Sequence, residues 1–477
     1  MPTFPSLQGS LMRRCGLVLV VAATIALPPR LESQEPAAPV LEPLFAIVSD
    51  GRWGLINRTG RVVVAPRYDG LVMDASLPAP KAIADAMQLQ GFNPIFDELI
   101  AVRLGRKWGF VSRSGELVIQ TAFNDVGRFG EERLAPAELN GKWGYINREG
   151  RFAIQPQFGY ARSIACNLAQ VMIPRGRKWG LIDLDGTFVV APEFDEVSDP
   201  CYWAVAYLRQ SRSPVTLAMY SPETYDRELI GVLVRNRMGY VNRRGKTVIE
   251  PAFVPGLWPD VAFREGLKQA RVKPGGKDGY IDRTGRFVIP PQFDDADDFL
   301  GNGLALVQMR GKYGYIDRTG AFVVEPSIES MPLPFYPDSA LAPIRMSGKV
   351  GYVDRKGKLV IGASFDSAGP FSDGLAVVTK ADKSGFIDES GAFVIEMKFD
   401  AVRAFSNGRA AACLGERWGF IDHGGRFVIE PRFQSVGDFR EGLALVTAGT
   451  EASYIDLDGR VVYSSRLPGL ASLHSPR

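Results

Sequence analysis

Residues 51–68 read GRWGLINRTGRVVVAPRY, and close variants of this stretch recur until the chain of 477 residues is nearly finished. The second glycine of the repeated pair Gly54 and Gly60 has a counterpart in ten further units, mostly 34–40 residues apart. The equivalent glycines are Gly60, Gly115, Gly150, Gly186, Gly245, Gly285, Gly320, Gly357, Gly391, Gly425 and Gly459. A fixed period of this length indicates a tandem repeat in place of several independent domains.

Each unit contains a predicted β-hairpin. In residues 311–328, two short runs rich in aromatic and β-branched residues flank Asp317-Arg318-Thr319-Gly320. Asp or Asn begins this turn in ten of the eleven units, and such side chains accept hydrogen bonds from the amides just ahead. The glycine then supplies a positive φ. A ladder of calcium ligands is disfavoured, because Asp, Asn and Ser interchange at the turn and the spacing of calcium loops is missing.

After each hairpin and a polar stretch, such as FDDADDFLGNG at residues 293–303, a third apolar run completes the unit, here Leu304–Val307. Proline follows the second strand in seven units and is predicted to end it, since proline cannot donate to a sheet. These prolines are Pro66, Pro156, Pro192, Pro251, Pro291, Pro326 and Pro431. The sequence therefore predicts an all-β fold of about eleven three-stranded units that stack into an open solenoid or superhelix. One or two β-propellers are the alternative, because a single ring usually has roughly 4–8 blades.

The ends of the chain lie outside the repeat. Arg13 and Arg14 precede the apolar run Leu17–Leu27, so residues 1–40 are predicted to be a signal peptide and linker, with no transmembrane span after cleavage. The repeat array is predicted over 41–463, with longer loops near 70–100 and 208–230. Residues 464–477 are predicted to be a disordered tail.

The charge balance does not require an anionic partner, since 56 basic residues face 53 acidic ones. A basic residue nevertheless stands at one slot in ten units, just before the position of Trp53. This row is predicted to be solvated and paired with the Asp residues of the turns. Binding of an anionic polymer is the alternative, and nucleic acid is not expected for an exported, nearly neutral protein.

Tryptophan precedes the first repeated glycine in five units, at Trp53, Trp108, Trp143, Trp179 and Trp418. The phrases GRWGLINRTG, GKWGYINREG and ERWGFIDHGG resemble the WG-repeat, or KWG-repeat, family of bacterial proteins. That resemblance implies a β-rich tandem array, often exported, with no common enzymatic activity.

The tryptophan slot is not constant in this chain. It holds Met238, Asp278, Tyr313, Val350 and Ser384 in other units. The slot is therefore predicted to serve packing, and a sugar-stacking platform is the alternative. Trp203 and Trp258 lie outside the slot and are weak ligand-binding candidates.

Catalytic groups are few. The two histidines, His423 and His474, have no partners for a triad, and no Cys or His pair has metal-ligand spacing, so no metal and no cofactor is expected. Cys166 and Cys201 are 35 residues apart, close to one period, which favours a disulfide between neighbouring units. Two small buried side chains are the alternative.

These patterns predict an exported, non-enzymatic repeat protein that offers an extended surface to another envelope or extracellular protein. A carbohydrate- or cell-wall-binding protein is the alternative, and a propeller-type polysaccharide hydrolase or lyase is the third candidate. The oligomeric state is left open.

Overall fold

The structure is a computed structural model that describes residues 41–71, 95–130, 132–198, 228–255, 262–299, 303–329 and 340–466. All of these residues belong to one compact unit, Leu41–Arg477. Within them no helix has the length and apolar character to cross a membrane. The predicted signal segment and most of the two predicted longer loops fall outside the described residues, so they stay predictions.

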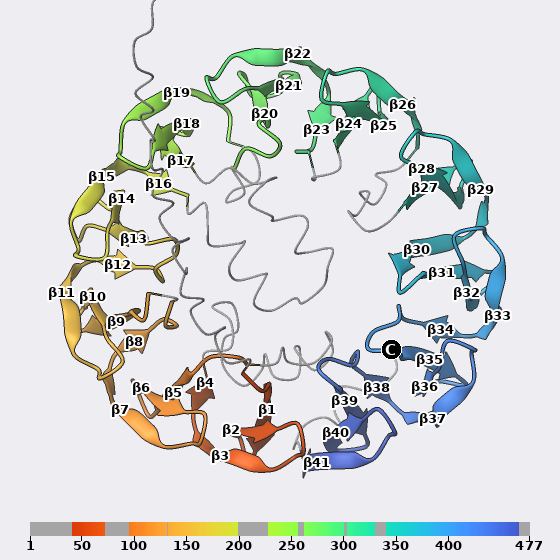
Figure 1. Cartoon of the computed structure of the whole chain (residues 1–477), viewed down its shortest axis with the longest axis horizontal. Helices are drawn as coiled ribbons and strands as arrows, with labels where there is room; N and C mark the ends of the chain where they lie inside the picture. The colour runs from red at the N-terminus through yellow and green to blue at the C-terminus, as the bar shows by residue number, and fades with distance from the viewer. Residues whose placement is uncertain are drawn as a thin grey trace, which may run out of the picture. The chain divides into compact units, whose positions relative to one another are not determined.

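Strands occupy four positions from the inner to the outer edge of the sheets (Figure 1). The innermost strands are β4(Gly70–Leu71), β8(Asp125–Val126), β12(Tyr160–Ala161), β16(Glu196–Val197), β23(Asp295–Ala296), β30(Ser367–Ser372), β34(Ala401–Val402) and β38(Ser435–Val436). The second strands are β1(Leu44–Ser49), β5(Leu99–Leu104), β9(Ala135–Leu139), β13(Ala169–Met172), β17(Leu229–Val234), β20(Lys268–Arg271), β24(Leu304–Met309), β27(Leu341–Met346), β31(Leu375–Lys380), β35(Ala410–Leu414) and β39(Leu443–Ala448).

The third strands carry the tryptophan slot, and the outer strands follow the repeated turn. The third strands are β2(Arg52–Asn57), β6(Lys107–Ser112), β10(Lys142–Ile146), β14(Trp179–Ile182), β18(Arg237–Asn242), β21(Asp278–Ile281), β25(Lys312–Asp317), β28(Lys349–Asp354), β32(Lys383–Ile387), β36(Arg417–Ile421) and β40(Glu451–Asp456). The outer strands are β3(Val62–Tyr68), β7(Leu117–Phe123), β11(Phe152–Phe158), β15(Phe188–Phe194), β19(Thr247–Phe253), β22(Phe287–Phe293), β26(Phe322–Ile328), β29(Leu359–Phe365), β33(Phe393–Phe399), β37(Phe427–Phe433) and β41(Val461–Arg466).

These described strands form eleven antiparallel sheets, eight with four strands and three with three. We number them as blades in chain order: blade 1 (β1–β3), blade 2 (β4–β7), blade 3 (β8–β11), blade 4 (β12–β15), blade 5 (β16–β19), blade 6 (β20–β22), blade 7 (β23–β26), blade 8 (β27–β29), blade 9 (β30–β33), blade 10 (β34–β37) and blade 11 (β38–β41). The predicted unit of three strands is therefore wrong in two respects. Most blades have a fourth, inner strand, and the hairpin and the third apolar run of one predicted unit belong to neighbouring blades. An inner strand of only two residues is too short to show an alternating pattern in the sequence.

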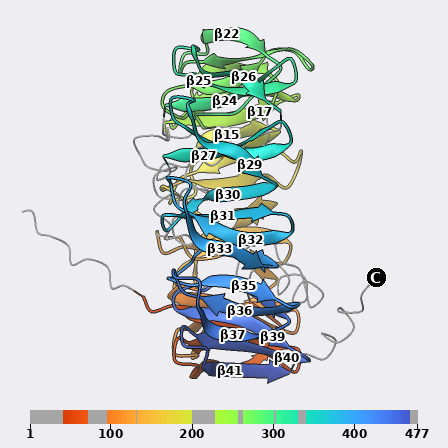
Figure 2. The same ribbon diagram turned by 90° about the vertical axis from the view of Figure 1, so that its right-hand side faces the viewer.

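The blades stand side by side around a closed ring (Figure 1), and their strands run roughly along the ring axis (Figure 2). Blade 11 packs against blade 1, where Phe45, Ile47 and Ile56 share one apolar cluster with residues of β39 and β40. At this junction the buried Tyr454 hydroxyl donates to the Ala46 carbonyl at 3.0 Å. The fold is thus the propeller that the sequence offered as the alternative, as one ring, and the favoured open array is not observed.

Each turn glycine explains part of this closure. A Cβ on Gly320 would lie 3.0 Å from Ile289 of the preceding blade, so the turn packs directly on its neighbour. The same contact joins the ends of the chain, since a Cβ on Gly60 would lie 2.0 Å from the Val462 carbonyl of blade 11. All eleven turn glycines also have positive φ. One slot therefore shapes the turn and sets how closely blades approach, and the turn chemistry alone reveals only the first role.

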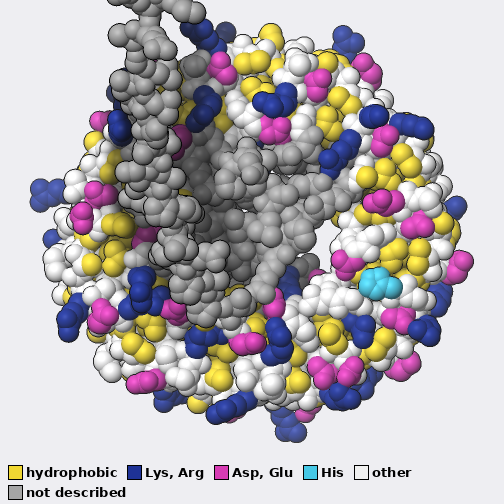
Figure 3. All heavy atoms as spheres, in the orientation of Figure 1, with side chains coloured by type: hydrophobic (Ala, Val, Ile, Leu, Met, Phe, Trp, Pro, Cys, Tyr) yellow, Lys and Arg dark blue, Asp and Glu magenta, His cyan; other side chains and the backbone are white. Residues whose placement is uncertain are grey.

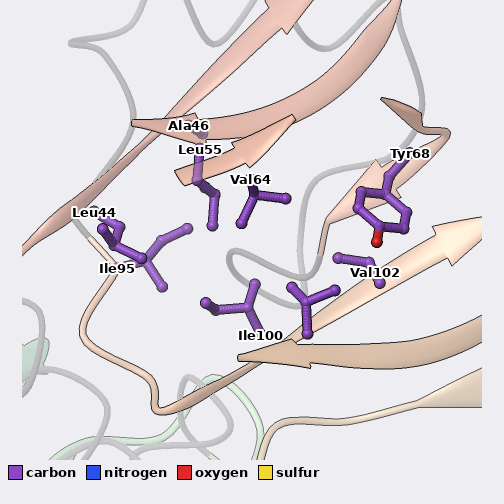
Figure 4. Close-up of a cluster of buried hydrophobic side chains, with 9 residues drawn as sticks. Leu44, Ala46, Leu55, Val64, Tyr68, Ile95, Ile100 and Val102 are labelled. Atoms are coloured by element: carbon purple, nitrogen blue, oxygen red, sulfur yellow. The ribbon is translucent and has the colours of Figure 1, made fainter. Parts of the chain in front are cut away.

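Aromatic pairs fill the junctions between blades. The residue at the end of one outer strand packs edge-on against the phenylalanine at the start of the next, with centroids 5.6–6.3 Å apart. These pairs are Phe123–Phe152, Phe158–Phe188, Phe253–Phe287, Phe293–Phe322, Phe365–Phe393 and Phe399–Phe427. Between blades 1 and 2, Leu55, Val64 and Tyr68 meet Ile100 and Val102 (Figure 4). The core is therefore divided into layers between blades, and no single blade has one of its own.

The prolines do not end the second strand of the hairpin, contrary to the prediction. Pro66 lies inside β3, and Pro431 lies inside β37. Both strands form the outer edge of their sheets, where a missing N–H leaves no neighbour unpaired. Each proline coincides with an irregularity in strand pairing opposite the first repeated glycine.

Candidate functional site

The carboxylates at the repeated turns are occupied by hydrogen bonds within the turn. Asp317 Oδ1 accepts from the Thr319 amide at 2.8 Å, the Thr319 hydroxyl at 2.6 Å and the Ala321 amide at 3.1 Å. These bonds, led by that of the hydroxyl, lower the pKa of Asp317. The same pattern recurs at Asp282 and Asp388. Within the described residues no cluster of three or more His, Cys, Asp or Glu could hold a metal ion.

Seven residues of the basic row have a side-chain partner among the described residues, but not the partner that we predicted. Lys312 and Asp317 stand at the two ends of β25, so a side chain cannot bridge them. The partner is instead an acidic or amide residue 17 positions after the cation, on the chain that crosses to the next blade. The pairs are Arg52–Asp69, Lys107–Asn124, Lys178–Asp195, Lys277–Asp294, Lys312–Glu329, Lys349–Asp366 and Lys383–Asp400.

The acid of this pair also holds the next blade. Asp400 accepts from Lys383 Nζ at 2.6 Å and, through its other oxygen, from the Gly415 amide of blade 10 at 2.7 Å. We call this arrangement of cation, acid and next-blade amide the clasp. The hydrogen bond from Lys383, followed by that from Gly415, lowers the pKa of Asp400. Basic and acidic side chains are interspersed around the visible face of the ring (Figure 3), so no arc there presents one sign of charge.

The tryptophan slot lies at the same end of the third strand as the clasp, between adjacent blades. Trp53, Trp108 and Trp418 are partly buried against the apolar layers of their junctions. Trp143 is buried in such a layer, and Trp179 is partly buried against another. An arginine guanidinium covers three of these rings, in the pairs Arg103–Trp108, Arg162–Trp179 and Arg403–Trp418. Most of the indole surface therefore contacts protein.

One known family matches the repeated units of this chain. The family described as "WG containing repeat" matches residues 53–73, 108–143, 143–173, 179–200, 279–313, 313–349, 351–383, 385–418 and 418–449. These matches span more than half of the chain. The chain belongs to the WG-repeat family. No curated protein matches the sequence of this WG-repeat protein.

Solved structures share only a general likeness with the WG-repeat protein. A eukaryotic initiation factor matches 89% of this chain and 96% of its own at 12% identity, with a TM-score of 0.38. BamB from Moraxella catarrhalis matches 51% of this chain and 86% of its own at 13% identity, with a TM-score of 0.27. Kluyveromyces lactis Hsv2 matches 34% of this chain and 59% of its own at 13% identity, with a TM-score of 0.25. With TM-scores this low, none of the three bears on function.

Several candidates from the sequence are not tested by the structure. Trp203, Trp258 and Cys201 fall outside the described residues. Cys166 is disulfide-bonded, and its partner also lies outside them, so the pairing with Cys201 stays a prediction that non-reducing peptide mapping can check. Cys413 is a buried free thiol, and burial raises its pKa, which disfavours the reactive thiolate.

Carboxylates gather most densely at residues 294–298 of the WG-repeat protein. Two nearby acids are held by ion pairs: Asp298 binds the buried Lys268, and Asp278 at the tryptophan slot binds Arg271. Partial burial, with Asp295 and Asp298 nearby, raises the pKa of Asp297 to about 6. Because the residue is more than one third exposed, water screens part of this effect. No described histidine joins this group, since His423 stacks on Phe405 in blade 10.

The clasp is interrupted between blades 3 and 4. The residue 17 positions after Lys142 is Gly159, and the next residue, Tyr160, begins the inner strand β12. Trp143 and Trp179 flank the Tyr160 ring at centroid distances of 5.1 and 5.9 Å. The slot-by-slot reading of the sequence missed this site, although the 17-residue spacing between cation and acid is a signal that would have found it.

Proposed function

We propose that this WG-repeat protein is an exported, non-enzymatic binding protein that docks an extended segment of another envelope or extracellular protein on its outer wall. The observation that carries the proposal is the outer edge of blade 8. Strand β29 ends its sheet, and its seven residues, 359–365, include neither a proline nor a charged residue. Exposed edge strands normally carry such residues, because unpaired backbone groups invite pairing with another chain.

The side chains around this edge are also apolar. Leu359 and Val360 of blade 8 and Phe393 and Val394 of blade 9 are each 42–44% exposed. Phe393 packs against Phe365 at the end of β29, so the start of β33 contacts this edge strand. At the same slots of blade 7, Phe322 and Val323 are partly buried. An added strand would find backbone partners on β29 and apolar contacts on both sides.

Proline substitution at the edge tests the proposal. Seven outer strands already carry proline at the slot of Ala363, so Ala363→Pro keeps the fold while placing a known blocker of strand addition on β29. A photocrosslinking residue at Val360, in the full chain in its native host, should give a discrete adduct with one protein. Ala363→Pro should reduce that adduct at least tenfold. Thr121→Pro in β7, the equivalent change in blade 2, should leave it unchanged.

The contrary outcomes are equally clear. An adduct that survives Ala363→Pro, or no adduct at Val360, would contradict docking at this edge. An adduct with a second copy of the chain, together with dimers in solution, would replace a foreign partner by self-association. Export is tested separately, by fractionating cells that express the full chain and cells that express a chain without residues 1–40. Equal retention of both inside the cell would refute it.

A further inference from the structure

The interrupted clasp leaves a cation without its usual acid. Lys142 is exposed at the start of β10, and among the described residues no carboxylate lies within ion-pair distance of it. In the intact clasps the ammonium group reaches the residue 17 positions on, which here is Gly159. The glycine also admits a neighbouring loop, since a Cβ on it would lie 3.0 Å from Pro174 Cα. Lys142 therefore stands at a crossing where, among the described residues, glycine replaces the usual acidic or amide partner.

The residue next to this crossing, Tyr160, is aromatic. No other described inner strand begins with an aromatic residue. Tyr160 begins β12 and is 41% exposed. The other inner strands begin with Gly70, Asp125, Glu196, Asp295, Ser367, Ala401 and Ser435. Trp143 and Trp179 contact Tyr160 from two blades and fix its orientation. An aromatic ring held in place yet open to solvent loses little conformational freedom when it binds a ligand.

The second cation at this place is already compensated. The Arg162 guanidinium lies 4.6 Å from the Trp179 ring centroid and donates to Gln170 at 2.8 Å and to Glu196 at 3.1 Å. Its role is to hold Trp179, and its charge is matched by Glu196. Among the described residues, the patch therefore combines one exposed aromatic ring, Tyr160, with the exposed Lys142, which has no ion-pair partner there.

We infer that Tyr160 and Lys142 form a subsite for one acidic sugar residue of a polysaccharide. The apolar C–H face of a pyranose ring stacks on an exposed aromatic ring, and a carboxylate on the same sugar pairs with the ammonium group. A phosphate polymer fits less well, because it needs several cations along its backbone and the neighbouring cation Lys178 is held by Asp195. This subsite is independent of the outer edge of blade 8 and extends the function beyond protein docking.

Binding of defined oligosaccharides tests the inference. Titration calorimetry and tryptophan fluorescence with the full chain should show that tri-galacturonate binds at least tenfold tighter than its methyl ester, which has the same ring but no charge. Lys142→Gln should abolish that preference. Tyr160→Ser should weaken binding of both ligands tenfold or more, and serine at this slot is compatible with the fold because β30 and β38 begin with it.

The controls separate the subsite from general charge. Lys383→Gln removes an ammonium group that is held by Asp400, so it should leave binding unchanged. Equal binding of the acid and its methyl ester, or full binding by Tyr160→Ser, would overturn the subsite. Tighter binding of inorganic polyphosphate that survives Tyr160→Ser would overturn the assignment to a sugar. None of these results depends on the crosslinking at Val360, so the two proposals can fail separately.

Discussion

Blades 10 and 11 share the same fold but differ in how their outer hairpins pair. In blade 10, Trp418 pairs with Phe433 and Phe420 with Ile429, so three residues of β37 face the single Gly419. In blade 11 the glycine is replaced by Ser453, and Ser453 pairs directly with Ser464. The two serine hydroxyls lie 3.0 Å apart. The bulge is therefore absent in the one blade that lacks the first repeated glycine.

The reason is steric. A Cβ on Gly419 would lie 2.4 Å from the Ile429 carbonyl oxygen, and each of the ten equivalent glycines has such a contact at 2.4–2.6 Å. Proline is not the cause of the bulge, since blades 2, 8 and 9 have the same shift with Thr121, Ala363 and Met397 at the proline slot. The difference between the blades shows that the glycine of the Trp-Gly pair permits a bulge.

The largest expected effect follows from placing the blade 11 residue in blade 10. Gly419→Ser should destabilise the protein by about 3 kcal/mol, because the new side chain overlaps backbone that cannot move freely. Urea unfolding measures the loss. The control is Ser453→Ala, where a side chain is already accommodated and only one exposed hydrogen bond is lost, so the change should stay within about 1 kcal/mol. Equal effects would mean that the bulge does not depend on the glycine.

A second variant sharpens the role of proline. Gly385→Ser in blade 9 should destabilise by roughly 1 kcal/mol less than Gly419→Ser. Met397 can rotate into regular pairing as in blade 11, whereas Pro431 has a fixed φ and no N–H to donate. The same unfolding experiment compares the two variants. If Gly385→Ser were the more harmful change, the outer strand could not flatten in the way that blade 11 suggests.

The junction of blade 11 with blade 1 has its own version of a recurring contact. Tyr280 donates to Asp297 of the next blade at 2.6 Å, whereas Tyr454 donates to Ala46 in β1 at 3.0 Å. Tyr454→Phe should destabilise by about 1 kcal/mol, the value of one buried hydrogen bond. Hydrogen exchange should become faster in β1 and β40. Faster exchange throughout the ring, with none specific to these strands, would show that the junction is not a separate weak point.

Much of this architecture can be predicted from single residues, but the closure of the ring of blades cannot. The Asp317 turn and the positive φ of Gly320 follow from local chemistry, which the sequence displays in every unit. Closure depends on a small rotation between blades, and that rotation arises from contacts such as Gly60 against Val462, 402 positions apart. The sequence of one unit does not indicate this rotation, so eleven units fit a ring and an open array equally well.

The candidate sites show the same limit. Lys312 is visible as a basic residue, but its partner became clear only from the crossing between blades, which places position 329 beside it. The prediction instead paired the cation with the nearest repeated acid in sequence, at the far end of the strand. Tyr160 was overlooked because a tyrosine in a polar linker has no distinguishing pattern until the inner strand is known.

The smallest expected effect concerns pH and again compares neighbouring junctions. Gln434 stands between blades 10 and 11 where Asp400 stands between blades 9 and 10, and its Oε1 accepts from the Gly449 amide at 2.8 Å. Because Lys383 lowers the pKa of Asp400 in the folded state, the ionised carboxylate favours folding above the pKa of the unfolded chain, about 3.9. That contribution is lost as pH falls through the folded-state value. Asp400→Gln keeps the amide contact and should make unfolding less dependent on pH below about 4.

Urea unfolding of the unaltered protein and of Asp400→Gln, each at pH 6 and pH 3, measures the change in pH dependence. Lys383→Gln should weaken the same dependence, since it removes the cation that holds the carboxylate ionised. The effect should be modest, because Asp400 is exposed and Asp195, Asp294 and Asp366 carry similar pairs with lowered pKa values. An unchanged difference between the two pH values in both variants would mean that the clasp aligns the blades through its amide bond alone, as Gln434 does, with the charge contributing nothing to folding.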